Sequence, residues 1–186
     1  MRLFVAIDLP EDIKQQIGAL QFGVPDAKWS QPENAHITLA FLGEIDASDM
    51  PDIALSLGRI NVPSFDLQIK GVGVYGNDKR PRVLWAGIPN APTLQHLHQK
   101  ITQTLSSSGV TFEDRRFRPH ITLARVQKSP YTRVREYLTE YSLFKTRPFH
   151  VDQFTLFSSI LGRTGPHYEE EIIFDLEPQN QPPDAL

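Results

Sequence analysis

Short stretches in which apolar and polar residues alternate recur along this chain. Alternation of this kind puts every second side chain on one side of an extended backbone, and so predicts strands with one buried face. Other short stretches are continuously apolar and rich in β-branched residues, which also favours strands. The predicted strands are residues 3–9, 36–42, 65–74, 83–88, 120–126, 151–160 and 168–176.

A different spacing, with apolar residues three and four positions apart, predicts helices between these strands. After Pro10 the residues Ile13, Ile17 and Leu20 share one helical face, and acidic residues stand in the first turn. A longer helix is predicted over residues 91–107, and shorter ones over 50–60 and 131–139. The polar stretch 28–34 predicts a loop or a short edge strand, and residues 76–81 predict a turn.

The order of these elements indicates a doubled unit. An apolar strand beginning at Leu3 leads through a helix and a polar loop to residues 36–40, which read HITLA. A second strand, beginning at Val83, leads in the same way to residues 120–124, which again read HITLA. Five matching residues inside the same order of elements indicate two similar lobes, each of which offers one motif strand to a shared cleft.

Strict alternation along the motif strands separates polar from apolar positions. His36 and Thr38 point to one side of the first strand, while Ile37, Leu39 and Phe41 point to the other, into the core. The same reasoning separates His120 and Thr122 from Ile121 and Leu123, and it puts Arg125 on the face opposite Thr122. If the lobes face each other, two imidazoles and two hydroxyls converge.

Such a convergence suits the opening of a cyclic phosphodiester. Because the ordinary pKa of histidine is about 6.5, one imidazole can be neutral and the other protonated at the same pH. The neutral one can take a proton from water, and the protonated one can give a proton to the departing ribose oxygen. Threonine hydroxyls can donate hydrogen bonds to the phosphate oxygens. A single strand histidine is more often a structural residue, so the function rests on the two matched motifs together.

Composition narrows the class of protein. The chain has 186 residues, no cysteine and a formal net charge of −3, which excludes thiol chemistry and argues against a general RNA-coating protein. The apolar run at the N-terminus is interrupted by Asp8 and Pro10, and no stretch has the ~20 apolar residues of a membrane span, so we expect a cytoplasmic protein without a membrane partner. No phosphate-binding loop of the nucleotide-dependent enzymes is present, and no cofactor is expected.

The paired motifs resemble the His-x-Thr-x motifs that name the 2H phosphoesterases. Within that superfamily the chain is similar to the RNA 2′,3′-cyclic phosphodiesterases, also called 2′-5′ RNA ligases or LigT-like proteins. The segments that carry the resemblance cover both halves in the expected order: RLFVAIDLP (2–10), NAHITLAFLG (34–43) and FRPHITLAR (117–125).

The resemblance implies a bilobal α+β fold, with an antiparallel sheet and helices in each of two pseudo-symmetric lobes and an active-site cleft between them. It implies hydrolysis of a 2′,3′-cyclic phosphate at an RNA end to a 2′-phosphate, with His36 as proton donor and His120 as proton acceptor. Thr38 and Thr122 would bind the phosphate, and Arg125 matches the position of a basic residue that follows the second motif in the family. The chemistry of the residues alone does not distinguish the roles of the two histidines.

Further expectations concern the ends of the chain and the substrate. Residues 1–176 are expected to form one bilobal domain, and residues 177–186, with three prolines, a flexible tail. The protein is expected to be a monomer and to need no metal ion. Tyr75, Phe41 and Trp85 are candidates for stacking on a terminal base. Burial in the core is favoured for Phe41 and Trp85, whereas Tyr75, beside a turn, is the predicted stacking surface.

The expected partner is an RNA with a cyclic phosphate end, such as a tRNA-like fragment or a short oligonucleotide. The same site could join such an end to a hydroxyl in 2′-5′ ligation, although water is the more abundant nucleophile. Two other functions stay open: a cyclic phosphodiesterase for a small nucleotide metabolite, and a non-catalytic binder of RNA ends.

Overall fold

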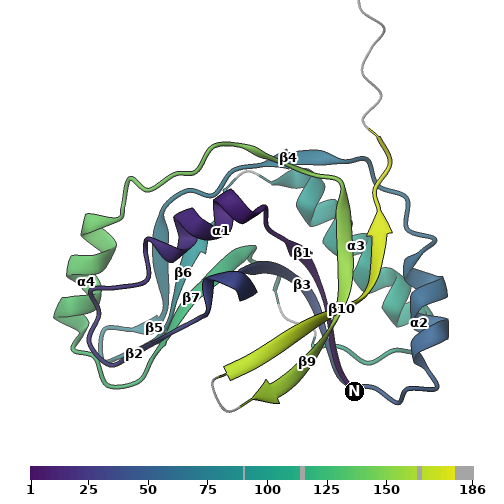
Figure 1. Ribbon diagram of the computed structural model, residues 1–186, viewed down its shortest axis with the longest axis horizontal. Coiled ribbons are helices and arrows are strands. Elements are labelled where there is room, and N and C mark those ends of the chain that lie inside the picture. Colours follow the sequence, from purple (N-terminus) through teal and green to yellow (C-terminus); the bar gives the residue numbers. More distant parts are fainter. Residues whose placement is uncertain (90, 114–115, 163–164, 179–186) are drawn as a thin grey trace, which may run out of the picture.

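Two four-stranded antiparallel sheets form the framework of the protein in the computed structural model, which describes residues 1–89, 91–113, 116–162 and 165–178 (Figure 1). The first sheet has the order β10-β9-β1-β3 and the second the order β2-β7-β6-β5. The strands of the first sheet are β1 (Arg2–Asp8), β3 (His36–Glu44), β9 (Gln153–Gly162) and β10 (Gly165–Asp175). Those of the second are β2 (Ala27–Trp29), β5 (Val72–Asn77), β6 (Arg80–Gly87) and β7 (His120–Val126).

The remaining elements are a two-stranded sheet and several helices. Strands β4 (Phe65–Leu67) and β8 (Phe149–Val151) pair with each other, one from each half of the chain. The helices are α1 (Glu11–Gly18), α2 (Met50–Leu57), α3 (Pro92–Ser107), α4 (Tyr131–Glu140) and the short 3₁₀ helix η1 (Pro32–Asn34). Two antiparallel sheets with four α-helices confirm the predicted α+β class and its two sheet-based lobes.

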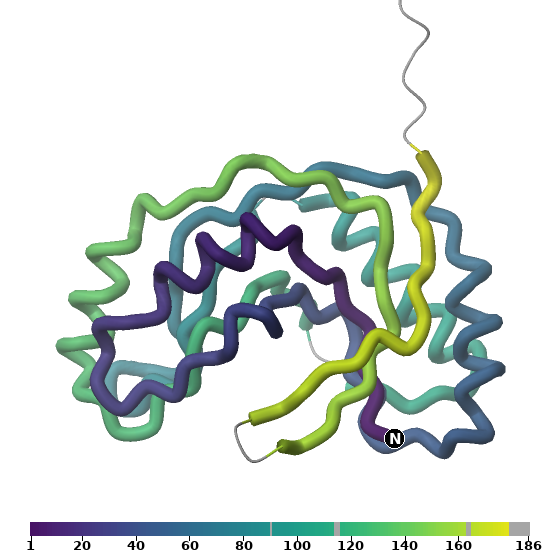
Figure 2. The backbone as a smooth tube through the Cα atoms, viewed as in Figure 1, coloured from purple at the N-terminus to yellow at the C-terminus, as the bar shows by residue number. Residues whose placement is uncertain are grey.

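Each half of the chain lends a strand to the sheet of the other half. Strand β9, late in the sequence, pairs with β1, and Figure 2 shows it running beside the N-terminal segment. Strand β5, from the first half, pairs with β6 of the second sheet. Apart from β2 and η1, which occur between α1 and β3, residues 2–77 and 80–162 share the order strand–helix–motif strand–helix–short strand–strand.

The predicted elements are mostly found, with differences at their ends. The single strand predicted over residues 65–74 is two strands, because the backbone turns at Gly71, where φ is +68°. The turn predicted over 76–81 shrinks to Asp78 and Lys79, since β5 and β6 extend almost to each other. The stretch 28–34 contains both the end of the edge strand β2 and the helix η1.

The first residue of the predicted tail is hydrogen-bonded to two residues of the predicted domain. Glu177, expected to open the flexible tail, is bound on both sides: its N–H donates to the carbonyl of Val62, and its carbonyl accepts from the N–H of Ser64. Residues 179–186 of the predicted tail lie outside the described residues.

Equivalent β-bulges occur in the two motif strands. Along the β1–β3 pair, Val5 is opposite Ala40 but Ala6 is opposite Thr38, so Leu39 is an extra residue. Along β6–β7, Leu84 is opposite Ala124 but Trp85 is opposite Thr122, so Leu123 is the extra residue. A bulge of this kind reverses the alternation of side chains beyond it.

These bulges correct two predictions. Phe41 is 46% exposed rather than buried with Ile37, and Arg125 lies on the same face as Thr122 rather than opposite it. The strand pairing also shifts the alignment of β1 with β6 by one residue. Phe4 is opposite Phe41 and Val83 is opposite Arg125, so Phe4, not Leu3, is the counterpart of Val83.

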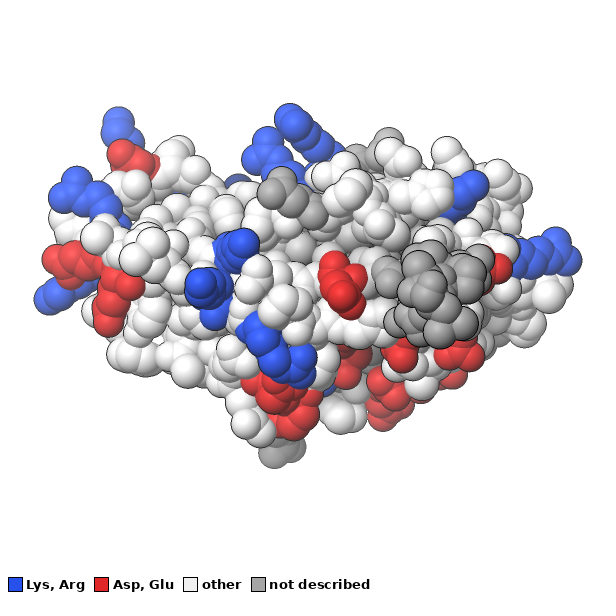
Figure 3. Space-filling model, turned by 90° about the horizontal axis from the view of Figure 1, so that it is seen from above, with Lys and Arg blue, Asp and Glu red and all other residues white. Residues whose placement is uncertain are grey.

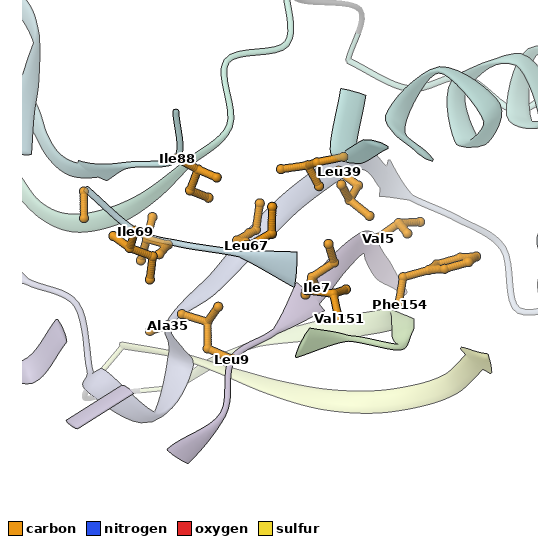
Figure 4. Packing of buried hydrophobic residues seen from close by; sticks show 14 of the residues in the cluster. Val5, Ile7, Leu9, Ala35, Leu39, Leu67, Ile69, Ile88, Val151 and Phe154 are labelled. Atoms are coloured by element: carbon orange, nitrogen blue, oxygen red, sulfur yellow. The ribbon is translucent and has the colours of Figure 1, made fainter. Parts of the chain in front are cut away.

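The apolar core lies between the sheets and the helices. Side chains from β1, β3, β4, β8 and β9, together with Leu9, Ile69 and Ile88, converge in it (Figure 4). The motif residues Ile37 and Ile121 are completely buried, as alternation up to that point predicts. The packing anchors both motif strands rigidly, which is what the display of polar side chains on their other face requires.

The surface has no uniform charge on the side where β4 lies. Figure 3 shows Lys and Arg side chains interspersed there with Asp and Glu, and the acidic residues gather toward one edge. Within the described part of the chain, no helix is both long and apolar enough to cross a membrane.

Candidate active site

Both motif strands contribute to the wall of one open cavity of about 240 Å³. Strand β3 supplies His36, Thr38 and Phe41, and β7 supplies the counterparts His120, Thr122 and Arg125. Equivalent residues of β3 and β7 are buried or exposed alike, because the bulges in the two strands are equivalent. The cavity thus has two matching halves.

The rest of the wall comes from two other parts of the fold. One is the segment from β2 to η1, and the other is the start of β10. Asn34 joins them, because its side-chain amide donates to the carbonyl of Pro166 over 2.9 Å. The residues these parts contribute are Lys28, Trp29, Ser30, Gln31, Asn34, Gly165, Pro166 and Tyr168.

Each histidine is held by a carbonyl two residues before it. His36 Nδ1 donates to Asn34 O and His120 Nδ1 donates to Arg118 O, each over 2.7 Å. A carbonyl oxygen only accepts, so Nδ1 must carry the hydrogen in both rings. The other nitrogen, Nε2, is therefore free in both rings to gain or lose a proton.

A tyrosine packs edge-on against each imidazole. Tyr168 meets His36 with ring centroids 5.3 Å apart and an angle of 88°, and Tyr75 meets His120 at 5.1 Å and 86°. These contacts, with the carbonyl hydrogen bonds, restrict the rings to one orientation.

The two histidines differ in the polar groups beside them. His36 Nε2 lies 3.0 Å from Thr38 Oγ1. Asp8, the residue paired with His36 across the strands, carries a carboxylate bound to Lys14 at 2.8 Å, whereas the residue paired with His120 is Gly87.

Burial lowers the pKa of His36 below the ordinary value for histidine. The hydrogen bond to Asn34 and the negative charge of Asp8 oppose this shift, while positive charge on Lys14 or on His120 adds to it. Burial is the largest of these influences on His36, and the charge of His120 is the smallest.

The charge of the cavity suits an anion. Among the described residues that line it, Lys28 and Arg125 are basic and none is acidic. Among the described residues there is also no group of three or more histidine or carboxylate side chains placed to hold a metal ion. The cavity therefore offers proton transfer, hydroxyl hydrogen bonds and positive charge from protein side chains.

Five of the six site residues taken from the sequence lie together here: His36, Thr38, His120, Thr122 and Arg125. The sixth, Tyr75, packs on His120 and on Trp85 and does not appear in the wall of the cavity. Sequence reasoning missed Lys28 and Tyr168, and it favoured burial for Phe41, which instead lines the cavity. The exposure of Phe41 depends on the bulge, and the motif strands alone give no signal of it.

A two-lobed α+β fold with a His-x-Thr strand from each lobe at one cavity is the arrangement of a phosphoesterase. The chain belongs to the family described as LigT like Phosphoesterase, whose model matches residues 7–85 and 87–168.

Relatives within this family resemble this chain over most of its length and of their own. An RNA 2′,3′-cyclic phosphodiesterase of Thermotoga maritima is 38% identical over 178 residues, which is 91% of this chain and 92% of the relative. One of Archaeoglobus fulgidus is 33% identical and covers 94% of this chain and all of the relative. The crystal structure of E. coli LigT in apo form is 30% identical, with a TM-score of 0.76 over 95% of this chain and 97% of LigT.

Proposed function

We propose that this protein hydrolyses a 2′,3′-cyclic phosphate at the end of an RNA to a 2′-phosphomonoester, by acid–base catalysis with His36 and His120. One observation carries the proposal: both imidazoles line one cavity, with Thr38 and Thr122 beside them. The names of the relatives from Thermotoga maritima and Archaeoglobus fulgidus support it, because those proteins are RNA 2′,3′-cyclic phosphodiesterases.

In the proposed reaction a water oxygen forms a bond to phosphorus while the bond from phosphorus to the ribose O3′ breaks. His120 Nε2 takes a proton from the water, and His36 Nε2–H gives a proton to O3′. His36 is made the donor by resemblance to the family. A second turnover needs the proton to return from His120 to His36 through solvent. Each transfer contributes about 10²- to 10⁴-fold to the rate.

The proposed reaction needs a protonated His36 and a neutral His120. Although burial lowers the pKa of His36, a phosphate anion in the cavity opposes that shift and favours the protonated form. Substrate binding therefore prepares His36 to donate.

Hydroxyl and cationic groups would hold the phosphate. Thr38 and Thr122 donate to its non-bridging oxygens, whose negative charge grows in the transition state. Arg125, on the same face as Thr122, adds a guanidinium that can bind two phosphate oxygens at once. The charge is supplied by side chains, so we propose that no metal ion takes part.

An oligonucleotide ending in a cyclic phosphate tests the proposal. The wild-type protein should release a 2′-phosphate end, resolved from the 3′ isomer by chromatography, at the same rate with and without EDTA. His36→Ala and His120→Ala should each lower kcat by about 10²- to 10⁴-fold. Full activity in either variant would contradict the mechanism, and loss of activity in EDTA would contradict the metal-free reaction.

A small nucleotide is the second candidate substrate. E. coli LigT has been crystallised with 3′-AMP, with ATP and with NADP⁺, and the cavity here has a volume of about 240 Å³. A series of cyclic phosphates from one to ten nucleotides in length distinguishes an RNA end from a mononucleotide as the substrate. If kcat/KM does not rise with length, the substrate is the mononucleotide.

Ligation and non-catalytic binding are the remaining alternatives. Opening the ring with the hydroxyl of a second RNA would give a 2′-5′ linkage, but water is far more abundant than a second RNA end. A binder without catalysis has no need of two histidines at one cavity, each oriented by a carbonyl through Nδ1. Tight binding of an RNA with a cyclic phosphate end, without turnover, would support a non-catalytic binder.

A further inference from the structure

Strand β2 breaks the symmetry of the two lobes. It comes from the first half of the chain, yet it pairs with β7 and forms the edge of the second sheet. The other motif strand, β3, is itself an edge of the first sheet as far as the chain is described, and carries no additional strand on that side. One half of the cavity therefore has an extra strand, and Lys28 is its middle residue.

Lys28 lies directly opposite Arg125 in the β2–β7 pair. Residues opposite each other in antiparallel strands point to the same face, with Cβ atoms about 4.5–5.5 Å apart. Both side chains are exposed, both line the cavity, and neither makes an ion pair with a described residue. Like charges in this position destabilise a sheet, so a ligand of opposite charge is the compensation that the arrangement calls for.

The backbone that carries Lys28 is held on both sides. The ring of Trp29 packs on Tyr137 with centroids 5.9 Å apart, and the N–H of Ser30 donates to the carbonyl of Leu123 over 2.9 Å. Lys28 therefore extends from a fixed position beside β7, and only its side chain has to be ordered when a ligand binds.

The two cations lie at different distances from the histidines. Burial raises the pKa of Tyr168, and positive charge on Arg125 opposes that shift, so Arg125 lies close to Tyr168. Because Tyr168 packs on His36, Arg125 is near the place proposed for the reacting phosphate. Lys28 is one strand further out, where the wall continues with the uncharged residues Ser30 and Gln31. A second anionic group of the substrate would match this outer position.

The second anionic group of a nucleotide is the phosphate on its 5′ oxygen. In an RNA it is the phosphodiester to the preceding nucleotide, and in a mononucleotide it is a 5′-phosphate. One ribose separates it from the 2′,3′ edge, a separation that two long side chains on neighbouring strands can match. We propose that Lys28 binds the phosphate on the 5′ oxygen of the terminal ribose, and so selects nucleotides over nucleoside cyclic phosphates. This inference rests on the proposed function of the cavity.

The test compares three cyclic phosphates that differ at the 5′ oxygen. They are adenosine 2′,3′-cyclic phosphate, the same nucleotide with a 5′-phosphate, and a diadenylate with a 2′,3′-cyclic phosphate end. The wild-type kcat/KM should be about 10-fold higher for the second and third than for the first, because a charge-assisted contact is gained. A gain for both supports the shared 5′-phosphate chemistry, and a gain for the diadenylate alone supports the phosphodiester of an RNA.

Variants of Lys28 assign that gain to this side chain. In Lys28→Met the 10-fold ratio should fall close to one, whereas Lys28→Arg keeps the charge and should keep most of the ratio. The matched control is Lys100→Met, because Lys100 is an exposed lysine of α3 that is not in the wall of the cavity. It should leave the ratio at the wild-type value.

Two results would overturn the inference. One is a wild type without preference for a 5′-phosphate. The other is an equal loss for all three substrates in Lys28→Met, which would put Lys28 on the reacting phosphate or give it a structural role. Thermal unfolding of the free protein identifies the structural role: Lys28→Met relieves two like charges and should unfold no lower than the wild type, whereas a structural residue would lower the midpoint.

Calorimetry separates this inference from the proposed function, because binding does not depend on turnover. Adenosine 2′,5′-bisphosphate should bind the wild type about 10-fold more tightly than adenosine 2′-monophosphate, and Lys28→Met should bind the two alike. This result would support the role of Lys28 even if none of the cyclic phosphates were hydrolysed. Equal affinity of the wild type for the two ligands would refute it.

Discussion

Tyr75 lies edge-on against the imidazole of His120, with ring centroids 5.1 Å apart at 86°, and Tyr168 stands in the same relation to His36 at 5.3 Å and 88°. Neither tyrosine belongs to a motif strand: Tyr75 is in β5 and Tyr168 is in β10. Each histidine is thus oriented from outside its own strand.

The first prediction concerns Tyr75, which packs on His120 without lining the cavity. Tyr75→Phe keeps the ring and removes a hydroxyl that lies 3.4 Å from His120 Nδ1. Because Nδ1 keeps its shorter hydrogen bond to the Arg118 carbonyl, kcat should stay within about twofold. Tyr75→Leu removes the edge contact, and a misaligned base should lower kcat about 10-fold with little change in KM. Steady-state kinetics on a cyclic-phosphate dinucleotide measure both. A rise in KM confined to base-bearing substrates would show instead that Tyr75 stacks on a base.

The second prediction concerns the pH dependence of catalysis. The carboxylate of Asp8 raises the pKa of His36, against the stronger lowering by burial. Asp8→Asn removes that support and leaves Lys14 unpaired, so the pKa of His36 should fall further. An acid that loses its proton at lower pH moves the alkaline limb of the kcat profile to lower pH.

Two variants control this measurement. Lys14→Met removes a charge that lowers the pKa of His36, and should move the alkaline limb to higher pH. Asp66→Asn breaks an exposed ion pair with His150 and should leave the profile unchanged. A shift of the acidic limb in Asp8→Asn, instead of the alkaline one, would reverse the roles assigned to the two histidines.

The third prediction concerns Arg125. Arg125→Met removes a cation from the cavity wall and should lower kcat/KM about 10- to 100-fold, because a charge-assisted contact with phosphate is lost. Arg125→Lys should recover part of this loss, since a lysine keeps the charge but not the two parallel donors. As a matched control, Arg133→Met breaks a surface ion pair with Glu136 and should be silent. The outcome that would exclude a phosphate contact is a wild-type kcat/KM in Arg125→Met.

The fourth prediction separates the two faces of β7. Ile121 is completely buried, so Ile121→Val should lower the free energy of unfolding by about 0.5–1.5 kcal/mol and leave kcat nearly unchanged. Thr122 lines the cavity, so Thr122→Ala should lower kcat and leave the unfolding midpoint close to that of the wild type. Urea unfolding and kinetics on the same samples check the pair. Equal stability losses would mean that Thr122 supports the fold.

Much of this molecule follows from its sequence. Local alternation places Ile37 and Ile121 in the core and turns His36 and His120 away from it, because a strand repeats every two residues whatever surrounds it. Helical spacing likewise locates α1 and α3. Because HITLA occurs in both halves of the chain, the sequence also predicts that the two motifs meet at one cleft.

The tertiary structure decides what lies beyond the fourth residue of each motif. The bulges at Leu39 and Leu123 depend on how β3 and β7 pair with β1 and β6, so a period of two cannot reveal them. They turn Phe41 and Arg125 into the cavity and make its halves differ. Strand β9 pairs with β1, and Tyr168 packs against His36, although the partners in each pair are more than 100 positions apart in the chain. The sequence by itself determined which residues the proposed chemistry uses. The pairing of distant strands decided how those residues face the cavity, because register and contact between strands are not local properties of the chain.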